Sequence, residues 1–235
     1  LHVRSRRQRQ MCIRDSPTVG AFSDKLISMG GSTILTEVPE MFGAEELLMN
    51  RCETEDLFNQ TVALVNDFKN YFKSHNQTIY ENPSPGNKKG GISSLEDKSL
   101  GCTQKSGSAP VMGVLSYGEP VKEKGLNLLS APGNDLVAST ALAASGAHIV
   151  LFTTGRGTPF ASPVPTVKIS TNNQLAKKKQ NWIDFNCGVM VNDTPLDELS
   201  ENLLDFVLEI ASGKKSKSEE AGFHDMAIFK QGVTL

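Results

Sequence analysis

The chain has 235 residues, 38% hydrophobic and 21% charged, a composition typical of a globular protein with a sizeable core. Its 24 basic and 26 acidic side chains give a net charge of −2, which argues against nucleic acid or a membrane surface as a partner. No apolar run approaches the roughly 18 residues of a membrane-spanning helix. The four cysteines form no CxxC pair, which favours reduced thiols and a cytoplasmic location.

Residues 1–16 differ in character from the rest of the chain. They carry five arginines without apolar periodicity, and no apolar core of a cleavable signal follows. We expect this segment to be non-native or disordered, because it resembles translated adapter sequence. A transit peptide and a basic arm that binds nucleic acid are the alternatives. The fold is therefore expected to begin at residue 17, within a longer protein.

Residues 17–110 are assigned to part of a central catalytic region. Ser16 or Pro17 is expected to open a helix that closes near Gly30. Thr54 is placed as the N-cap of an amphipathic helix that fades out near His75. The other predicted elements of this region are a strand at 32–37 and helices at 45–51 and 93–101.

Residues 111–235 are expected to form a C-terminal α/β domain. Asn134 is predicted to cap a helix that Gly146 ends, and 148–153 is an apolar run typical of a strand buried on both faces. Strands alternating with helices predict right-handed crossovers and a mostly parallel sheet flanked by helices. The remaining predictions are strands at 111–117, 126–130, 164–170 and 182–185, helices at 175–180 and 196–212, and a mobile charged loop at 214–220.

A Gly-Arg-Gly turn follows the predicted strand at 148–153. The planar guanidinium of Arg156 suits recognition of a carboxylate, and the glycines on either side allow a ligand to approach the backbone closely. Ligands of parallel sheets collect at the carboxyl ends of strands, where this turn lies. The alternative is an ordinary turn with an exposed arginine.

Glutamates cluster after the predicted strand at 32–37. Glu37, Glu40 and Glu45 are suited to binding a hard divalent ion or to acting as a general base. Glutamate is also common in the first turn of a helix, where it interacts favourably with the helix dipole. Both interpretations stay open for this cluster.

Three further segments carry candidate polar groups. Lys105 fits recognition of an anion, whereas Cys102 is either a soft metal ligand or an inert buried thiol. Asp135 is able to hold a metal or a sugar hydroxyl, although capping accounts for part of its role. The loop at 76–91, with Asn82 and Asn87, is either a solvated linker or a ligand loop. HExxH, GxSxG, P-loop and GxGxxG motifs do not occur in the sequence.

Seven ordered motifs of the chain resemble the altronate/galactarate dehydratase family, over nearly everything from residue 17 to residue 235. The resemblance implies that the chain is the C-terminal half of a larger multidomain enzyme, with an upstream half that is missing here. The motifs lie at 34–45, 82–87, 95–105, 132–135, 152–160, 182–185 and 228–230.

The resemblance further implies a hydro-lyase that removes water from altronate to give 2-dehydro-3-deoxy-D-gluconate. It also implies a divalent metal, iron(II) or alternatively manganese(II), and leaves a homo-oligomer open. Galactarate dehydratase activity, sulfolactate lyase-like activity and a non-catalytic subunit that binds sugar acids are the alternatives.

Site roles follow from this family assignment as hypotheses. Arg156 and Lys105 are expected to hold the substrate carboxylate, while Glu37 and Glu40 supply the base. Hydroxyl groups of the sugar acid are assigned to Asn82, Asn87, Thr154 and Thr158. Metal contacts are assigned to Glu45, Asp135 and Cys102.

Overall fold

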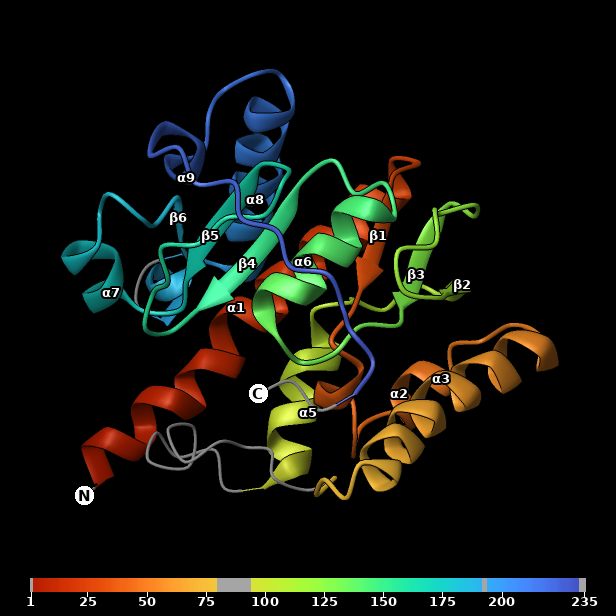
Figure 1. Cartoon of the computed structure of the whole chain (residues 1–235). Helices are drawn as coiled ribbons and strands as arrows, with labels where there is room; N and C mark the ends of the chain where they lie inside the picture. Colours follow the sequence, from red (N-terminus) through yellow and green to blue (C-terminus); the bar gives the residue numbers. More distant parts are fainter. Residues whose placement is uncertain (1, 80–93, 192–193, 233–235) are drawn as a thin grey trace.

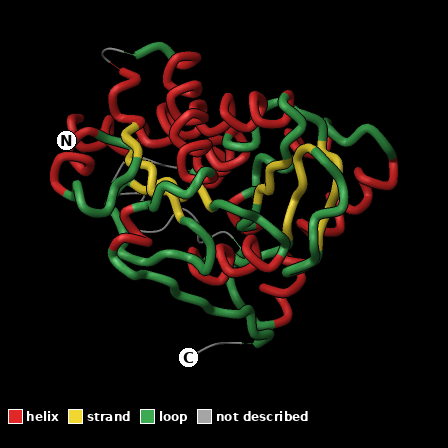
Figure 2. Tube along the Cα trace, turned by 90° about the horizontal axis from the view of Figure 1, so that it is seen from above, coloured by secondary structure: helices red, strands yellow, loops and turns green. Residues whose placement is uncertain are grey.

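The computed structural model describes residues 2–79, 94–191 and 194–232. Two separate three-stranded sheets form its centre, and helices pack around them (Figures 1 and 2). Every strand pair in both sheets is parallel, so the predicted α/β class with parallel strands and flanking helices is confirmed. The predicted single sheet is instead divided in two, with strand orders β1-β3-β2 and β4-β5-β6.

The six strands fall close to the positions that the sequence indicates. β3 and β5 are the central strands, and all five residues of each are buried. The two-residue strand β6 begins where the predicted strand at 182–185 ends, because Trp182 and Ile183 still turn back onto the preceding helix through hydrogen bonds to Lys179. The strands are β1 (Ser32–Leu35), β2 (Val111–Leu115), β3 (Gly125–Leu129), β4 (Val150–Thr154), β5 (Thr166–Ser170) and β6 (Phe185–Asn186).

Capping residues fix the ends of several helices. Thr54, Ser94 and Asn134 each accept a hydrogen bond from the backbone amide three residues later. Gly146 follows α6 with φ of +94°, as expected of a residue that ends a helix. The helices are α1 (His2–Ser28), η1 (Val38–Glu40), α2 (Glu46–Met49), α3 (Glu55–Ser74), α5 (Leu95–Gln104), α6 (Asp135–Ala144), α7 (Asn173–Lys178), η2 (Cys187–Val191), α8 (Leu196–Ala211) and α9 (Lys217–Glu220).

Two further segments differ from the predicted secondary structure. The first helix begins at His2 and runs through Pro17, whereas the sequence predicts a start at Ser16 or Pro17. The predicted charged loop at 214–220 contains α9, because Ser216 and Glu219 form a reciprocal capping box. The assignment of residues 1–16 as non-native stays a prediction.

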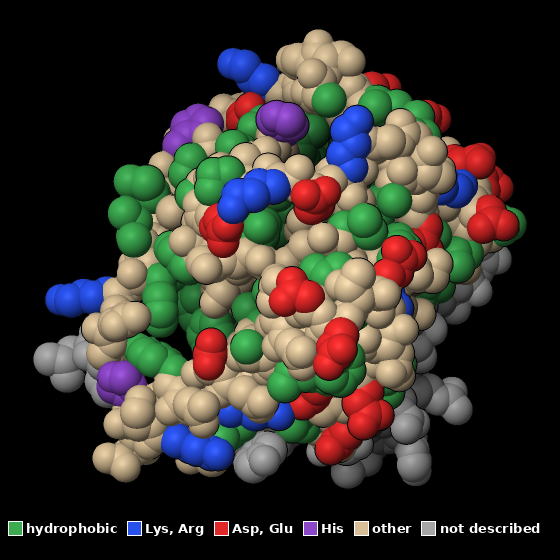
Figure 3. All heavy atoms as spheres, turned by 90° about the vertical axis from the view of Figure 1, so that its right-hand side faces the viewer, with side chains coloured by type: hydrophobic (Ala, Val, Ile, Leu, Met, Phe, Trp, Pro, Cys, Tyr) green, Lys and Arg blue, Asp and Glu red, His purple; other side chains and the backbone are tan. Residues whose placement is uncertain are grey.

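Three apolar clusters hold the helices against the sheets. One packs α3 against sheet β1-β3-β2, and a second packs α1 and α8 against β5 through Val167 and Ile169. A third joins α6 to Leu115 and Leu129. Among the described helices, none combines the length and apolar character needed to cross a bilayer. On the face in Figure 3, basic and acidic side chains are interspersed among polar and hydrophobic ones.

Candidate active site

A cavity of about 1040 Å³ lies between the two sheets. It is bordered by β1, an edge strand of one sheet, and by β4, an edge strand of the other. Polar and charged side chains gather where these two strands end, whereas the rest of the lining is largely apolar. The charged members are Asp15, Glu37, Glu40, Lys98, Lys105 and Asp135.

Glu37 follows β1 in a strained backbone conformation. Its φ of 63° and ψ of 60° lie in the left-handed region, which a non-glycine residue seldom adopts. The amide of Val38, the next residue, donates a hydrogen bond of 3.1 Å to the carbonyl of Ala131 and so fixes the turn. Such strain is concentrated at functional sites, where the surrounding structure maintains it. The turn directs the Glu37 carboxyl group into the cavity lining.

The surroundings of Glu37 favour its protonated form. Burial raises its pKa to about 8, and the negative charges of Glu40 and Asp135 add to this rise. Lys105 and Lys98 oppose the rise without cancelling it. At neutral pH, Glu37 is therefore mainly a carboxylic acid that can donate a proton.

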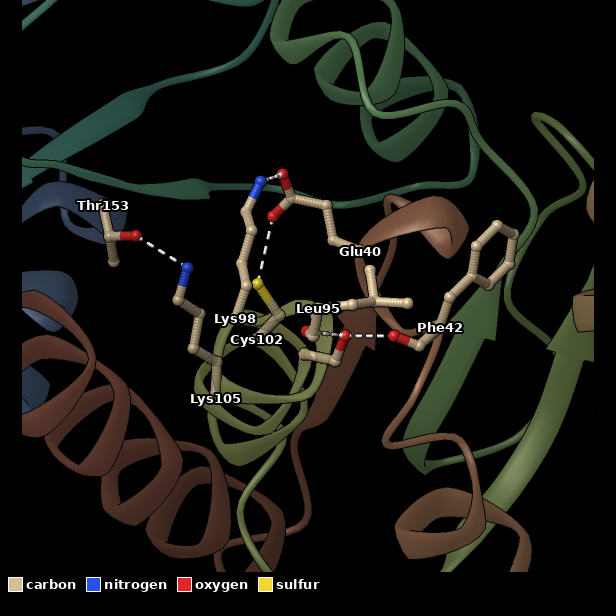
Figure 4. Close-up of polar contacts among 8 residues, drawn as sticks. Glu40, Phe42, Leu95, Lys98, Cys102, Lys105 and Thr153 are labelled. Atoms are coloured by element: carbon tan, nitrogen blue, oxygen red, sulfur yellow. Dashed lines mark hydrogen bonds and ion pairs between the residues drawn. The ribbon is translucent and has the colours of Figure 1, made fainter. Parts of the chain in front are cut away.

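Glu40 is held by two side chains of α5 (Figure 4). Lys98 Nζ donates to Glu40 Oε1 at 2.5 Å, and Cys102 Sγ donates to Glu40 Oε2 at 3.0 Å. Burial alone would raise the pKa of Glu40, but Lys98 and Cys102 hold it below its usual value. Burial and the Glu40 charge raise the pKa of the Cys102 thiol well above its usual value. Glu40 is thus a carboxylate and Cys102 a neutral thiol.

Lys105 lies one position beyond α5 and supplies a cation to the same space. Its Nζ donates to Thr153 Oγ1 at 2.8 Å, which connects the end of α5 to β4 across the cavity (Figure 4). Burial works against the charge. In the alkaline range where a lysine loses its proton, the surrounding acidic groups are ionised, and their charges raise the pKa of Lys105 above its usual value; in order of effect they are Cys102, Asp15, Glu40 and Glu37. Lys105 therefore stays charged beside Glu37.

Asp135 begins α6 at the rim of the cavity. Desolvation and the nearby Glu40 raise its pKa, so its carboxylate has more affinity for a proton than an isolated aspartate. Asp15 and Ser16 also line this end of the cavity. Burial raises the pKa of Asp15, whereas the charge of Lys105 and a hydrogen bond with Thr153 oppose this rise.

The structure thus brings together Glu37, Glu40, Cys102, Lys105 and Asp135 from the predicted set. Thr154 lines the cavity as well, although its hydroxyl accepts a hydrogen bond of 2.9 Å from the Gly157 amide.

Other predicted residues lie apart from this group. Arg156 is exposed, and neither it nor Thr158 belongs to the cavity lining. Glu45 is paired with Lys69 at 2.7 Å and is also outside the lining. Asn82 and Asn87 lie outside the described residues.

The predicted metal ligands do not assemble into a site among the residues that the structure describes. Nowhere in the described ranges do three His, Cys, Asp or Glu side chains converge so as to hold a metal ion. Both Glu40 oxygens have protein partners, Lys98 Nζ and Cys102 Sγ. The described side chains therefore offer no preformed site for a divalent ion.

Lys98 and Thr153 belong to the site but are not among its predicted residues. Lys98 lies in a motif with Cys102 and Lys105, and its spacing of four from Cys102 places both on one side of a helix. That spacing is the signal that could have identified Lys98. Thr153 precedes the predicted Thr154 by one residue, and strand alternation turns the two side chains to opposite faces.

Comparison with known proteins agrees with the sequence motifs. The family model described as "D-galactarate/Altronate dehydratase, C-terminal" matches residues 12–234. Altronate dehydratases of Escherichia coli (strain K12) and Bacillus subtilis (strain 168) are each 59% identical to the chain over 95% of its length, which is 45% of theirs. The galactarate dehydratase (L-threo-forming) of Escherichia coli (strain K12) is 35% identical over 91% of the chain and 42% of its own length.

The chain therefore spans less than half the length of these curated relatives. The match to the family model covers almost the whole chain and includes the turn with Glu37, helix α5 with Lys105 and the end of β4. The chain belongs to the D-galactarate/altronate dehydratase family and corresponds to the C-terminal region of its members.

Proposed function

We propose that the complete protein dehydrates a hexonate, with altronate as its substrate, and that the polar end of the cavity carries out the elimination. The 59% identity to two altronate dehydratases supports this substrate over galactarate, for which the relative is 35% identical. The observation that carries the proposal is that Glu37, Lys105 and Asp135 line one end of a single cavity, where burial and neighbouring carboxylates raise the pKa of Glu37 to about 8.

Lys105 is suited to the substrate carboxylate. When a proton leaves the carbon next to that carboxylate, negative charge builds up on its oxygens as an enediolate forms. A fixed, desolvated ammonium group stabilises this charge more than water does, because it needs no reorganisation during the reaction. Thr153 keeps the Lys105 ammonium in place through its hydroxyl.

Glu37 and Asp135 are assigned the two proton transfers. Asp135 removes the proton from the carbon beside the carboxylate, since its raised pKa makes it a better base than the lysine-bound Glu40. The electrons of that C–H bond form the new double bond, and the neighbouring hydroxyl leaves as water with the proton of Glu37. The resulting enol takes up a proton at carbon 3 and releases the proton of its hydroxyl at carbon 2, which gives the 2-oxo-3-deoxy acid.

Glu40 and Lys98 act as a positioning pair in this proposal. Their ion pair neutralises most of the charge of Glu40, while the negative charge that remains helps to keep Glu37 protonated. A divalent ion, expected from the family resemblance, stays a prediction for which the described residues offer no preformed site.

The proposal is tested by measuring 2-oxo-3-deoxy acid formation from altronate by the complete protein and its Lys105→Met variant. Loss of a preorganised charge is expected to lower kcat/KM by about 100-fold or more. Lys69→Met is the matched control, because Lys69 is paired with Glu45 outside the cavity lining. Equal kcat/KM of Lys105→Met and wild type would contradict the proposed role of Lys105. A higher kcat/KM for galactarate or sulfolactate than for altronate would contradict altronate as the substrate.

A further inference from the structure

β4 borders the cavity along its whole length, whereas its neighbour β5 reaches the cavity only at its carboxyl end. Residues 147–154 all belong to the lining, but of the described residues 166–172 Thr171 alone does. The expected burial of 148–153 on both faces is wrong for the described chain, since Leu151 and Phe152 are only half-buried. The second sheet therefore contributes the side of one strand and the tip of the next.

Thr171 is a buried threonine whose hydroxyl has an unused donor. The residue is only 1% exposed. Its Oγ1 accepts a hydrogen bond of 3.3 Å from Asn172 Nδ2, and within the described part of the chain the hydroxyl donates to no acceptor. Buried polar groups of native proteins are nearly always hydrogen-bonded. An unused O–H group in a cavity lining is therefore suited to an acceptor atom of a ligand.

Several other hydroxyls of the lining already donate their protons within the protein. Each of them has a backbone carbonyl or another side-chain hydroxyl as its acceptor, and they are Ser23, Thr36, Ser106 and Ser139. Their hydrogen bonds account for their presence in a folded core. The hydroxyl of Thr171 has no such explanation among the described residues.

Asn172 holds the backbone around Thr171 in place. Its Oδ1 accepts a hydrogen bond of 2.8 Å from the Leu175 amide and so caps α7. Its Nδ2 donates to the carbonyl of Gly155 at 3.3 Å, which ties the turn after β5 to the turn after β4. A donor that is fixed before the ligand arrives loses little conformational entropy on binding.

Thr171 lies within reach of a substrate bound at Lys105. Thr153 pairs with Ile169, so Thr171 is two residues further along the neighbouring strand and on the same face of the sheet. The amide of Thr171 donates to the carbonyl of Thr154 at 3.2 Å, which continues the ladder to this point. Strand spacing and rise then separate the Cα atoms of Thr153 and Thr171 by about 8 Å. Lys105 Nζ is 2.8 Å from Thr153 Oγ1 (Figure 4), so a six-carbon chain held there by its carboxylate spans the distance.

We propose that Thr171 is a specificity-determining residue that donates a hydrogen bond to the C6 hydroxyl of altronate. This inference rests on the proposed function and adds the group that recognises the end of the substrate remote from the reaction. Under this division, the end of the first sheet supplies Glu37 for the chemistry and the end of the second sheet recognises the substrate. Because the contact is far from carbons 2 and 3, it should act mainly on KM.

The inference is tested by measuring kcat/KM of the complete protein for altronate and for 6-deoxyaltronate. A hydrogen bond between uncharged groups should give wild type a preference for altronate of about 3- to 10-fold. Thr171→Val should abolish this preference, whereas Thr171→Ser, which keeps the hydroxyl, should retain it. Thr166→Val is the matched control, because Thr166 is buried in β5 but lies outside the cavity lining.

The preference is a ratio measured within one protein, so it does not depend on the fraction of a variant that folds. Thr171→Ala provides the same comparison if the valine variant does not fold. Equal kcat/KM of wild type for the two substrates, or the same preference in wild type and in Thr171→Val, would overturn the role of Thr171 and leave that of Lys105 intact. A wild-type protein that does not dehydrate altronate would instead overturn the proposed function, and this inference with it.

Discussion

The two ends of the cavity differ in what their side chains contribute. At the polar end, Glu37, Glu40 and Lys105 are close enough to shift one another's pKa, so a change in one alters the proton affinity of the others. At the apolar end, residues such as Ile149 and Leu142 contribute apolar surface and carry no titratable group. We conclude that substitutions at the polar end should change catalysis, whereas those at the apolar end should change stability.

The largest effect is expected for Glu37→Gln. Removal of a general acid typically lowers a rate by about 100- to 10,000-fold, so kcat of the complete protein on altronate should fall within this range. Glu46→Gln is the control, because Glu46 is exposed on α2 and outside the cavity lining. Unchanged kcat for Glu37→Gln would remove this residue from the chemistry.

Ile149→Ala probes the apolar end. Ile149 is partly buried against the apolar cluster of α1, α8 and β5, so truncation should lower the free energy of unfolding by about 1–3 kcal/mol, less than for a fully buried residue. The value of kcat should stay within about threefold of wild type. Leu47→Ala serves as the control, since Leu47 is 48% exposed on α2. A loss of kcat without a loss of stability would reverse the proposed division between the two ends.

The pH dependence of stability follows from the raised pKa of Glu37. The folded protein binds this proton more tightly than the unfolded chain, so the stabilisation is fully present below the usual glutamate pKa and is lost as pH rises through about 8. Glu37→Gln keeps a neutral side chain at every pH. Its Tm relative to wild type should therefore be higher at pH 8.5 than at pH 5.5, by about 2 °C or more. A difference that does not change with pH would show that the proton affinity of Glu37 is normal.

The smallest effect is expected for Arg156→Ala. The turn after β4 leaves this guanidinium exposed, whereas the turn after β1 directs Glu37 into the cavity. An exposed charge contributes at most about 1 kcal/mol, so kcat/KM should fall by no more than about fivefold. A loss as large as that of Lys105→Met would restore Arg156 to the carboxylate-binding role that its sequence context predicts.

Local chemistry made much of the fold predictable. Caps such as Thr54 and Asn134 act through neighbouring backbone amides, and the sequence contains all the information they need. The division into two sheets depends on how strands far apart in sequence meet, and periodicity carries no information on that.

Prediction of the site is limited in the same way, by contacts between residues far apart in the sequence. Glu37, Glu40 and Lys105 were predictable from their place at strand and helix ends. The position of Glu45 outside the cavity was not predictable. Lys69, which binds its carboxylate, lies 24 residues away on another helix. The spacing of Lys98 from Cys102 indicates a shared side of a helix, but only the folded chain shows that its ammonium reaches Glu40.

The pH dependence of kcat/KM for altronate tests the role of Glu37 most directly, because this quantity reports groups of the free protein. If Glu37 must carry a proton, kcat/KM should decline above an apparent pKa of about 8, and the residual activity of Glu37→Gln should lack that decline. An activity that rises through pH 8, or the same decline in both proteins, would contradict the account.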